Sequence, residues 1–464
     1  MSGFLVSAAW RSSGKTTVAT GLIAGLAARG LAVQPFKKGP DYIDPQWLGL
    51  AAGRPCRNLD PYLQGDAEVS AHWARHAGGC DVAVVEGNLG LHDGMDLEGA
   101  DSNAALARKL GLPVVLVLNA RGMARGVAAL LHGLATFDPL VRIEGVILNR
   151  VAGARHESKL RAAIERYTRI PVLGAIGEDP RLGVVERHLG LVPAGEVGDA
   201  AERVAAMREA VCAGVDLDRV MSIAVSATAV AAPPAPAAAP APTVRIAVAR
   251  DRAFGFYYAD DVDAFREAGA ELVAFDALAD ADIPEADGLL IGGGFPEVLC
   301  AELEANRDLR DSLRRRIASG LPVYAECGGL MYLARTISWR GRTWEMVGAL
   351  PADVVMHAKP VGKGYVRLAE TAAHPWGSGE GAIVHAHEFH YSTLADADPA
   401  LAYAWRVERG EGTDGRRDGI VHRNVLAQYA HQRNAGGNDW VRRFVGHVAR
   451  VKAARAGAAP AVAS

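Results

Sequence analysis

A glycine–lysine motif near the N-terminus has the residue types that bind phosphates. The segment Ser7–Thr17 reads SAAWRSSGKTT and lies between an apolar strand candidate and a helix candidate. Phosphate loops follow G-x-x-x-x-G-K-[ST], and their backbone N–H groups cradle phosphates at a helix N-terminus. Ala9 replaces the first glycine, and a serine-rich turn that caps a helix is the alternative interpretation. We predict an ATP site formed by Ser13, Gly14, Lys15, Thr16 and Thr17.

Charged and polar residues follow the neighbouring strand candidates. Glu86 ends the run DVAVVEG, where we expect it to hold Mg²⁺ with Thr16, and a helix cap is the alternative. Asn149 ends another apolar run and is assigned to the adenine side of the ATP site. The segment PFKKGPDYIDP supplies groups that suit anionic substrate oxygens or a transferring phosphoryl group, unless it is a solvated basic turn: Lys37, Lys38, Asp41 and Asp44.

The second half of the chain places a cysteine between a strand candidate, LPVYA, and a helix candidate, LMYLA. Small residues after Cys327 fit the sharp turn that exposes a nucleophile, although a buried structural thiol is the alternative. The N–H of Gly328 and that of Gly294, in a neighbouring glycine turn, could bind an oxyanion. Cysteine catalysis also needs a histidine base, for which this half offers His385, His387, His390 and His431.

Apolar runs that alternate with helical periodicities must position these groups. That alternation predicts α/β architecture in both halves, with parallel sheets covered on both faces. Residues 340–407 have shorter alternating runs and are expected to be richer in antiparallel strands. Residues 231–242 contain only Ala and Pro, which predicts a semi-rigid, extended linker between the halves.

Composition excludes several classes of protein. Half of the 464 residues are hydrophobic, which is too many for a disordered chain. A net charge of −3 argues against nucleic acid as a partner. No apolar run reaches the roughly 18–20 residues of a membrane span, and the N-terminus lacks the layout of a secretory signal. Five widely spaced cysteines without a CxxC pair indicate a reducing, cytoplasmic compartment.

The chain resembles the cobyrinic acid a,c-diamide synthase family in a series of motifs. In chain order these are SSGKTT, KKGPDYIDP, VVEGNLGLHDG, GVILNRV, GGGFPE, AECGGLMYL and HEFHYS. The resemblance implies two doubly wound, mainly parallel-sheet domains, one P-loop NTPase-like and one class I glutamine-amidotransferase-like. It also implies ATP- and glutamine-dependent amidation of the a and c acetates of cobyrinate or hydrogenobyrinate in cobalamin biosynthesis. The expected boundaries are an ATP-binding amide-ligase domain at 1–225, a linker at 226–242, an amidotransferase domain at 243–452 and a disordered tail at 453–464.

The same resemblance assigns the glutaminase residues. Cys327 would be the nucleophile, and His431, in the run LAQYAHQR, would be the histidine that activates it. Arg433 stands where class I glutaminases usually have the glutamate that orients the histidine. The cysteine and histidine would then act as a dyad, or the group that orients His431 would come from elsewhere.

Three other interpretations share some of these motifs. The loop and the KKGPDYIDP segment are also similar to sirohaem amidases, which act on a sulfite-reductase cofactor precursor. A ParA-like ATPase switch would share the GKTT motif but would leave the cysteine turn unexplained. His385 and His387 would lie on one face of a strand, as the ligands of a metal insertase could. The expected partners are ATP, L-glutamine and a tetrapyrrole carboxylic acid, with no nucleic acid or membrane, and a homodimer is left open.

Overall fold

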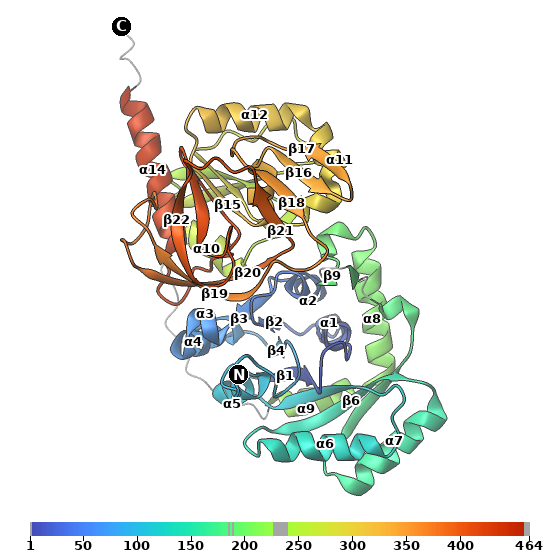
Figure 1. The fold of residues 1–464 in the computed structure, drawn as a ribbon. Coiled ribbons are helices and arrows are strands. Elements are labelled where there is room, and N and C mark those ends of the chain that lie inside the picture. The colour runs from blue at the N-terminus through green and yellow to red at the C-terminus, as the bar shows by residue number, and fades with distance from the viewer. Residues whose placement is uncertain (1, 184–185, 188–189, 226–239, 459–464) are drawn as a thin grey trace. The chain divides into compact units, whose positions relative to one another are not determined.

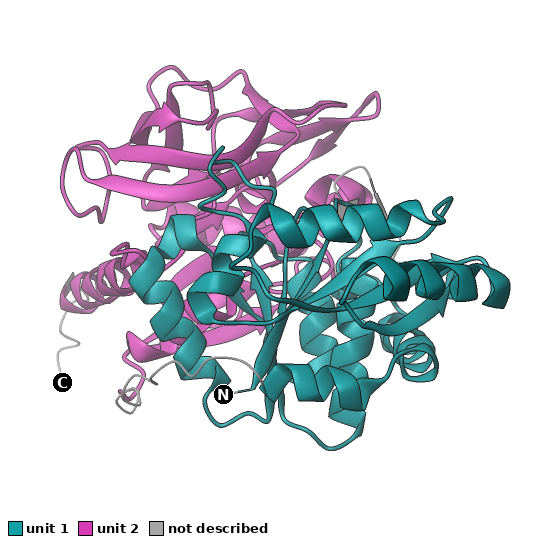
Figure 2. Ribbon diagram, turned by 90° about the horizontal axis from the view of Figure 1, so that it is seen from below, with its two compact units in different colours: residues 1–235 teal, residues 236–464 magenta. Residues whose placement is uncertain are grey.

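The computed structural model describes residues 2–183, 186–187, 190–225 and 240–458. The chain divides into two compact units, Met1–Ala235 and Pro236–Ser464, which are shown in different colours in Figure 2. The division falls within the segment 226–242 expected to be a linker, of which residues 226–239 lie outside the described residues.

Unit 1 is built on a parallel seven-stranded sheet of order β3-β2-β4-β1-β5-β6-β7 (Figure 1). Its strands are β1 (Gly3–Ala8), β2 (Val33–Lys38), β3 (Arg57–Leu59), β4 (Val82–Glu86), β5 (Val114–Asn119), β6 (Ile143–Val151) and β7 (Val172–Gly177), with a short pair, β8 (Glu186–Arg187) and β9 (Gly190–Leu191). Its α-helices are α1 (Lys15–Ala28), α2 (Asp44–Ala52), α3 (Pro61–Gln64), α4 (Asp66–Ala77), α5 (Asn103–Leu110), α6 (Gly126–Phe137), α7 (Ala154–Tyr167), α8 (Ala200–Gly214) and α9 (Leu217–Val225).

Helices cover both faces of this sheet, which explains why its strands are apolar throughout. Every residue of β1 and of β4 is buried. Residues of α1, α2, α8 and α9 pack in the hydrophobic cluster on one face. Residues of α4 to α7 pack in the cluster on the other. The expected doubly wound α/β architecture is therefore present in unit 1, with β3 as a strand that the sequence pattern did not predict.

Unit 2 contains a nine-stranded sheet and a smaller four-stranded sheet of order β17-β16-β18-β21. Its strands are β10 (Val244–Ala249), β11 (Phe254–Phe256), β12 (Ala270–Phe275), β13 (Gly288–Ile291), β14 (Gly293–Gly294), β15 (Val323–Glu326), β16 (Thr336–Trp339), β17 (Arg342–Glu345), β18 (Asp353–Met356), β19 (Gly362–Glu370), β20 (Ile383–His390), β21 (Ser392–Ala395), β22 (Ala402–Arg409), β23 (Arg417–His422) and β24 (Val425–Gln428). Its α-helices are α10 (Ala259–Glu267), α11 (Cys300–Ala305), α12 (Arg307–Ala318), α13 (Gly328–Leu333) and α14 (Trp440–Ala458).

The large sheet of unit 2 changes direction at β24. The strands β12, β10, β13, β15 and β24 are parallel neighbours, and β24 then pairs antiparallel with β23. The remaining strands, β22, β19 and β20, continue the antiparallel part. This part includes much of the segment 340–407, where short alternating runs predicted antiparallel strands. The turn after β15 and the turn after β24 lie side by side, because these two strands are paired.

The C-terminal tail differs from expectation. Helix α14 continues to Ala458, so the prediction of disorder from residue 453 is wrong for its first part, and residues 459–464 lie outside the described residues. The run VKAARAGA is rich in alanine, lysine and arginine, which have high helix propensity and extend the helix. Among the described helices, none is long and apolar enough to cross a membrane.

Candidate active sites

The phosphate loop of unit 1 connects β1 to α1. Gly14 caps the N-terminus of α1 at φ +88°, a left-handed conformation that glycine adopts without strain. The side-chain amide of Asn149 donates to the carbonyl of Ser13 at 2.9 Å, so this residue, expected beside adenine, holds the loop backbone. The Ser13 hydroxyl donates within the loop, to the carbonyl of Trp10. The Thr17 hydroxyl donates to the carbonyl of Leu182.

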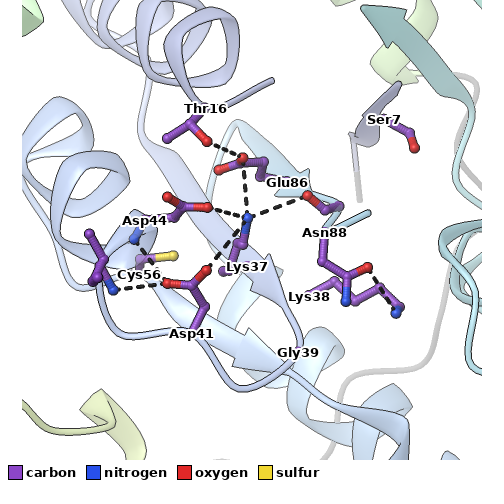
Figure 3. A network of polar contacts seen from close by, with 12 residues as sticks. Ser7, Thr16, Lys37, Lys38, Gly39, Asp41, Asp44, Cys56, Glu86 and Asn88 are labelled. Carbon is purple, nitrogen blue, oxygen red and sulfur yellow. Dashed lines mark hydrogen bonds and ion pairs between the residues drawn. The ribbon is translucent and has the colours of Figure 1, made fainter. Parts of the chain in front are cut away.

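A buried network of charges lies beside the loop (Figure 3). The hydroxyl of Thr16, on α1, donates to Glu86 Oε1 at 2.7 Å. The ammonium of Lys37, at the end of β2, lies 3.2 Å from the same Glu86 oxygen and 2.5 Å from Asp44 Oδ2. Asp41 Oδ2 is 3.9 Å from that ammonium. The carboxyl ends of β2 and β4, the loop after β2 and the starts of α1 and α2 therefore bring five of the predicted residues together.

Burial changes the acidity of several groups in this network. It raises the pKa of Glu86 to about 7, against the opposing effect of Lys37, and raises that of Asp41 to about 6. It lowers the pKa of Lys15 to about 8, an effect to which the Lys37 charge adds. Burial would also lower the pKa of Lys37, but Asp44 and Glu86 reverse that effect and raise it above its ordinary value.

The two lysines predicted to bind substrate oxygens have different surroundings. Lys37 is held by the protein's own carboxylates, whereas Lys38 Nζ donates to Asn88 Oδ1 at 3.2 Å. Successive residues of a strand point to opposite faces, which explains why these neighbours have separate partners. Burial lowers the pKa of Lys38. The sequence pattern assigned both lysines to anionic oxygens, and the structure distinguishes Lys37, which pairs with carboxylates, from Lys38, which faces an amide.

In unit 2, Cys327 lies on the turn between β15 and α13. Its φ of +46° is rare for a residue with a side chain and marks the strained turn that the two glycines after it predicted. Its N–H donates to the carbonyl of Gln428, at the end of the neighbouring strand β24, at 2.7 Å. A Cβ atom on Gly328 would lie 3.0 Å from the nitrogen of Gly294, so the two predicted oxyanion donors belong to adjoining backbone segments.

His431 follows β24 and is buried next to this turn. It makes a side-chain hydrogen bond to Cys327, and its Nδ1 lies 3.3 Å from Glu326 Oε2. Burial alone would lower the pKa of His431, but the bonds to Cys327 and Glu326 raise it to about 10. The main chain of His431 also forms a bridge with that of His387, with an N–H to carbonyl bond in each direction.

The other histidines of the HAHEFHYS segment have different surroundings. His387 stacks on the ring of His431 with centroids 4.9 Å apart, and burial lowers its pKa well below the ordinary value. His390 stacks on Tyr429 at 3.9 Å, and His385 lies at an exposed position of β20. Within the described ranges, no set of three potential metal-ligating side chains includes His385 or His387.

Glu326 is the residue of this site that the sequence reasoning missed. Its Oε1 atom accepts bonds from the Tyr324 hydroxyl at 2.5 Å and from the backbone N–H of Gln432 at 2.9 Å, while Oε2 faces His431. The sequence feature that could have identified Glu326 is its place directly before the cysteine in AECGG. Arg433, whose position raised the question of orientation, instead pairs with Asp260 at 3.0 Å.

Comparisons with known proteins match both units. Residues 12–191 match the CobQ/CobB/MinD/ParA nucleotide binding domain, and residues 245–438 match the CobB/CobQ-like glutamine amidotransferase domain. Fold and sites therefore define a protein that combines a nucleotide-binding P-loop domain with a glutamine amidotransferase domain. A solved structure described as glutamine amidotransferase matches 44% of this chain and 98% of its own, at a TM-score of 0.33 and 16% identity.

Relatives align over almost the whole length. A cobyrinate a,c-diamide synthase of Magnetococcus marinus is 48% identical over 94% of each chain. A hydrogenobyrinate a,c-diamide synthase of Mycobacterium bovis is 43% identical, covering 97% of this chain and 98% of its own. A cobyrinate a,c-diamide synthase of Methanosarcina acetivorans is 41% identical, with coverage of 97% and 96%. The chain belongs to the cobyrinate a,c-diamide synthase family.

Proposed function

We propose that this protein converts the a and c acetate carboxylates of cobyrinate or hydrogenobyrinate to amides, using ATP and L-glutamine. The observation that carries the proposal is the presence of two chemically different sites on one chain that aligns end to end with such synthases. One site has a phosphate loop with a buried carboxylate, and the other has a cysteine hydrogen-bonded to a histidine. Each suits one half of a glutamine-dependent amidation.

In the first half-reaction, unit 2 releases ammonia from glutamine. His431 accepts the proton of Cys327, and the thiolate attacks the side-chain amide carbon of glutamine. We assign the backbone N–H groups of Gly328 and Gly294 to the oxyanion, because a Cβ atom on Gly328 would lie 3.0 Å from the nitrogen of Gly294. The C–N bond breaks, His431 gives its proton to the leaving nitrogen, and water hydrolyses the thioester to glutamate. The product used by the second half-reaction is ammonia.

In the second half-reaction, unit 1 activates the carboxylate. An acetate oxygen of the tetrapyrrole attacks the γ-phosphorus of ATP, ADP leaves, and an acyl phosphate forms. Ammonia then attacks the acyl carbon, phosphate leaves, and the amide remains. We assign Ser13, Gly14 and the N-terminus of α1 to the phosphates, Lys15 to their growing charge, and Lys38 to an anionic oxygen of the substrate.

The residues beside the loop fit a magnesium ion. Hydroxyl and carboxylate oxygens are the ligands that Mg²⁺ prefers. Glu86 Oε2 is buried and has no hydrogen-bond partner among the residues that the structure describes, so it has an acceptor site to offer. We propose that Thr16 and Glu86 hold Mg²⁺ when ATP binds, with Asp44 on the other side of the Lys37 ammonium that it shares with Glu86. The ion would neutralise charge on the β and γ phosphates.

A substrate panel tests this function. Purified protein with glutamine, ATP and Mg²⁺ is incubated with cobyrinate, hydrogenobyrinate and sirohydrochlorin-type acids, and products are identified by their mass. We expect two amidations on cobyrinate or hydrogenobyrinate, with glutamate and ADP formed in equal amounts to the new amides. Amidation of sirohydrochlorin-type acids alone would assign the protein to sirohaem metabolism, and no amide on any acid would refute the proposal. Because the nucleophile is a thiol, we place the activity in a reducing compartment such as the cytoplasm.

A further inference from the structure

A buried glutamate that precedes the cysteine contacts the proposed catalytic histidine. Glu326 and His431 are both buried, and Oε2 lies 3.3 Å from Nδ1. A carboxylate at this nitrogen favours the ring form that carries a proton on Nδ1. Nε2 is then the nitrogen that can accept the proton of Cys327. We propose that Glu326 is the positioning residue that fixes the orientation and tautomer of His431 during glutamine hydrolysis.

The contacts of the other carboxylate oxygen fix the direction of Glu326. Oε1 accepts one bond from the Tyr324 hydroxyl and one from the Gln432 backbone N–H. The Tyr324 hydroxyl in turn accepts a bond from the side-chain amide of Gln432 at 3.0 Å. Both groups that face Oε1 are donors, so Oε2 is the oxygen available to the imidazole. The carboxylate therefore has a specific orientation.

The remaining surroundings of the imidazole are consistent with this role. On one side, His387 stacks on the ring, and its lowered pKa keeps it neutral. At Gly293, a Cβ atom would lie 2.5 Å from His431 Cε1, so only glycine leaves room for the ring. The titratable side chains that contact the His431 ring in these interactions are Cys327, Glu326 and the neutral His387. When the thiol proton moves to His431, Glu326 supplies the negative charge beside the imidazolium.

The inference rests on the proposed roles of Cys327 and His431, and Glu326→Gln tests it separately. In this variant the donors at Oε1 require the amide oxygen at that position, so the NH₂ group faces His431 Nδ1. An N–H donor there would force the ring proton onto Nε2, which could no longer accept the thiol proton. A comparable change in a serine protease triad lowers kcat by about 10⁴-fold. We expect glutamine-dependent kcat to fall by about 10²- to 10⁴-fold, with KM for glutamine little changed.

Three measurements compare Glu326→Gln with the wild type. The first is amidation with glutamine, and the second is amidation with ammonium salts, which should be unchanged. The third is the protonation of His431 from long-range ¹H–¹⁵N spectra at pH 7, with its signals assigned from His431→Ala. Because the pKa of His431 is raised to about 10, we expect protons on both Nδ1 and Nε2 in the wild type, and a proton on Nε2 alone in Glu326→Gln. Glutamine-dependent activity within a few-fold of the wild type, or a proton retained on Nδ1 in Glu326→Gln, would overturn the inference.

Matched variants separate positioning from folding. Glu370→Gln also neutralises a buried carboxylate of unit 2, but its partners are Arg443 and the Gly379 N–H, and we expect it to retain both activities. Glu326→Asp keeps the charge and should retain the proton on Nδ1 of His431 and more activity than Glu326→Gln. If the Asp variant were as inactive as the Gln variant, or if Glu326→Gln lost the ammonia reaction too, a structural role would replace the proposed one. If Cys327→Ser kept glutamine-dependent activity, the proposed function itself would fail.

Discussion

The two sites both bury carboxylates but balance their charge differently. In unit 1, Glu86 and Asp44 face the ammonium of Lys37, which their charges keep protonated. In unit 2, Glu326 faces His431, whose charge depends on whether it holds the proton of Cys327. The first carboxylates have a permanent cation beside them. The second has a cation only when a proton has moved.

This difference matches the chemistry proposed for each site. Phosphoryl transfer needs charges in fixed positions before the reaction begins, because the protein mainly orients and stabilises the transferring group. Thiol chemistry needs a group that gains and then returns a proton within one turnover. A permanent ion pair suits the first task, and a titratable pair suits the second. The predictions below test this contrast.

The largest expected effect is the separation of the two half-reactions by Cys327→Ser. Serine is a much weaker nucleophile here, so we expect glutamine-dependent amidation to fall by about 10⁴-fold or more. Amidation with ammonium salts should remain near the wild-type rate, because acid activation does not use the thiol. Rates of amide formation with each nitrogen source provide the measurement. Loss of both rates would show that the two sites are not chemically independent.

Lys15→Ala should instead slow both reactions. This lysine lies at the start of α1 and is assigned to the β and γ phosphates, so its loss removes stabilisation of charge that grows during transfer. Losing one such contact costs about 10²- to 10³-fold in rate. ADP release and amide formation should fall together with either nitrogen source. Near-normal ADP release would mean that ATP reacts elsewhere.

Lys37→Met tests the permanent ion pair. It would leave Asp44 and Glu86 buried without their cation, which costs about 3–5 kcal/mol when one partner of a buried pair is removed. In urea unfolding of the full chain, the transition of unit 1 should move to a lower urea concentration. The double variant Lys37→Met with Glu86→Gln removes one of the unpaired carboxylates and should recover part of the loss. Equal stability of Lys37→Met and the wild type would contradict the contrast drawn above.

The smallest expected effect concerns the strand pair that carries His431. Burial raises the pKa of Asp418 from its ordinary 3.8 to about 6, and the carboxylate accepts the N–H groups of Tyr429 and Ala430. A raised pKa contributes stability that is full below the ordinary value and is lost as pH rises through about 6.

Replacing Asp418 by Asn should remove that pH dependence. Between pH 5 and pH 7.5 the ionisation of Asp418 should lower the free energy of unfolding of the wild type by about 1 kcal/mol. The Asn variant should not show this decrease. The variant also has a constant penalty, because one backbone N–H would face an amide NH₂ group. Denaturation at the two pH values gives the difference. If the wild type and the Asn variant differed in free energy of unfolding by the same amount at pH 5 and at pH 7.5, the assignment would be refuted.

Much of unit 1 could be predicted from its sequence. The apolar runs of β1, β2, β4, β5, β6 and β7 and the GKTT motif are local signals, and the carboxyl ends of parallel strands meet at one edge. That rule predicts from the sequence that Lys37, Asp44 and Glu86 lie close together. It could not predict that Lys37 pairs with the carboxylates while Lys38 faces Asn88, because partner choice depends on side-chain packing.

Unit 2 was less predictable because its site depends on pairings between distant segments. The turn at Cys327 has a local glycine signal, and the sequence pattern indicated it. The stacking of His387 on His431 requires β20 to lie beside the turn after β24, which no periodicity indicates. The contact of Glu326 with His431 joins residues 105 apart in the chain. Arg433 occupies the expected position of the acid, and the signal for its replacement was the place of Glu326 directly before Cys327.

The positive φ at Cys327 allows the acid and the nucleophile of this site to be neighbours in the chain. Along a regular strand, neighbouring residues point to opposite faces, so residues 326 and 327 could not both reach one imidazole. The turn at Cys327 allows both side chains to contact His431. An acid two residues after the histidine lies on a different segment from the nucleophile, whereas an acid next to the cysteine keeps a fixed spacing from it along the chain. An insertion or deletion elsewhere in the gene cannot separate the two.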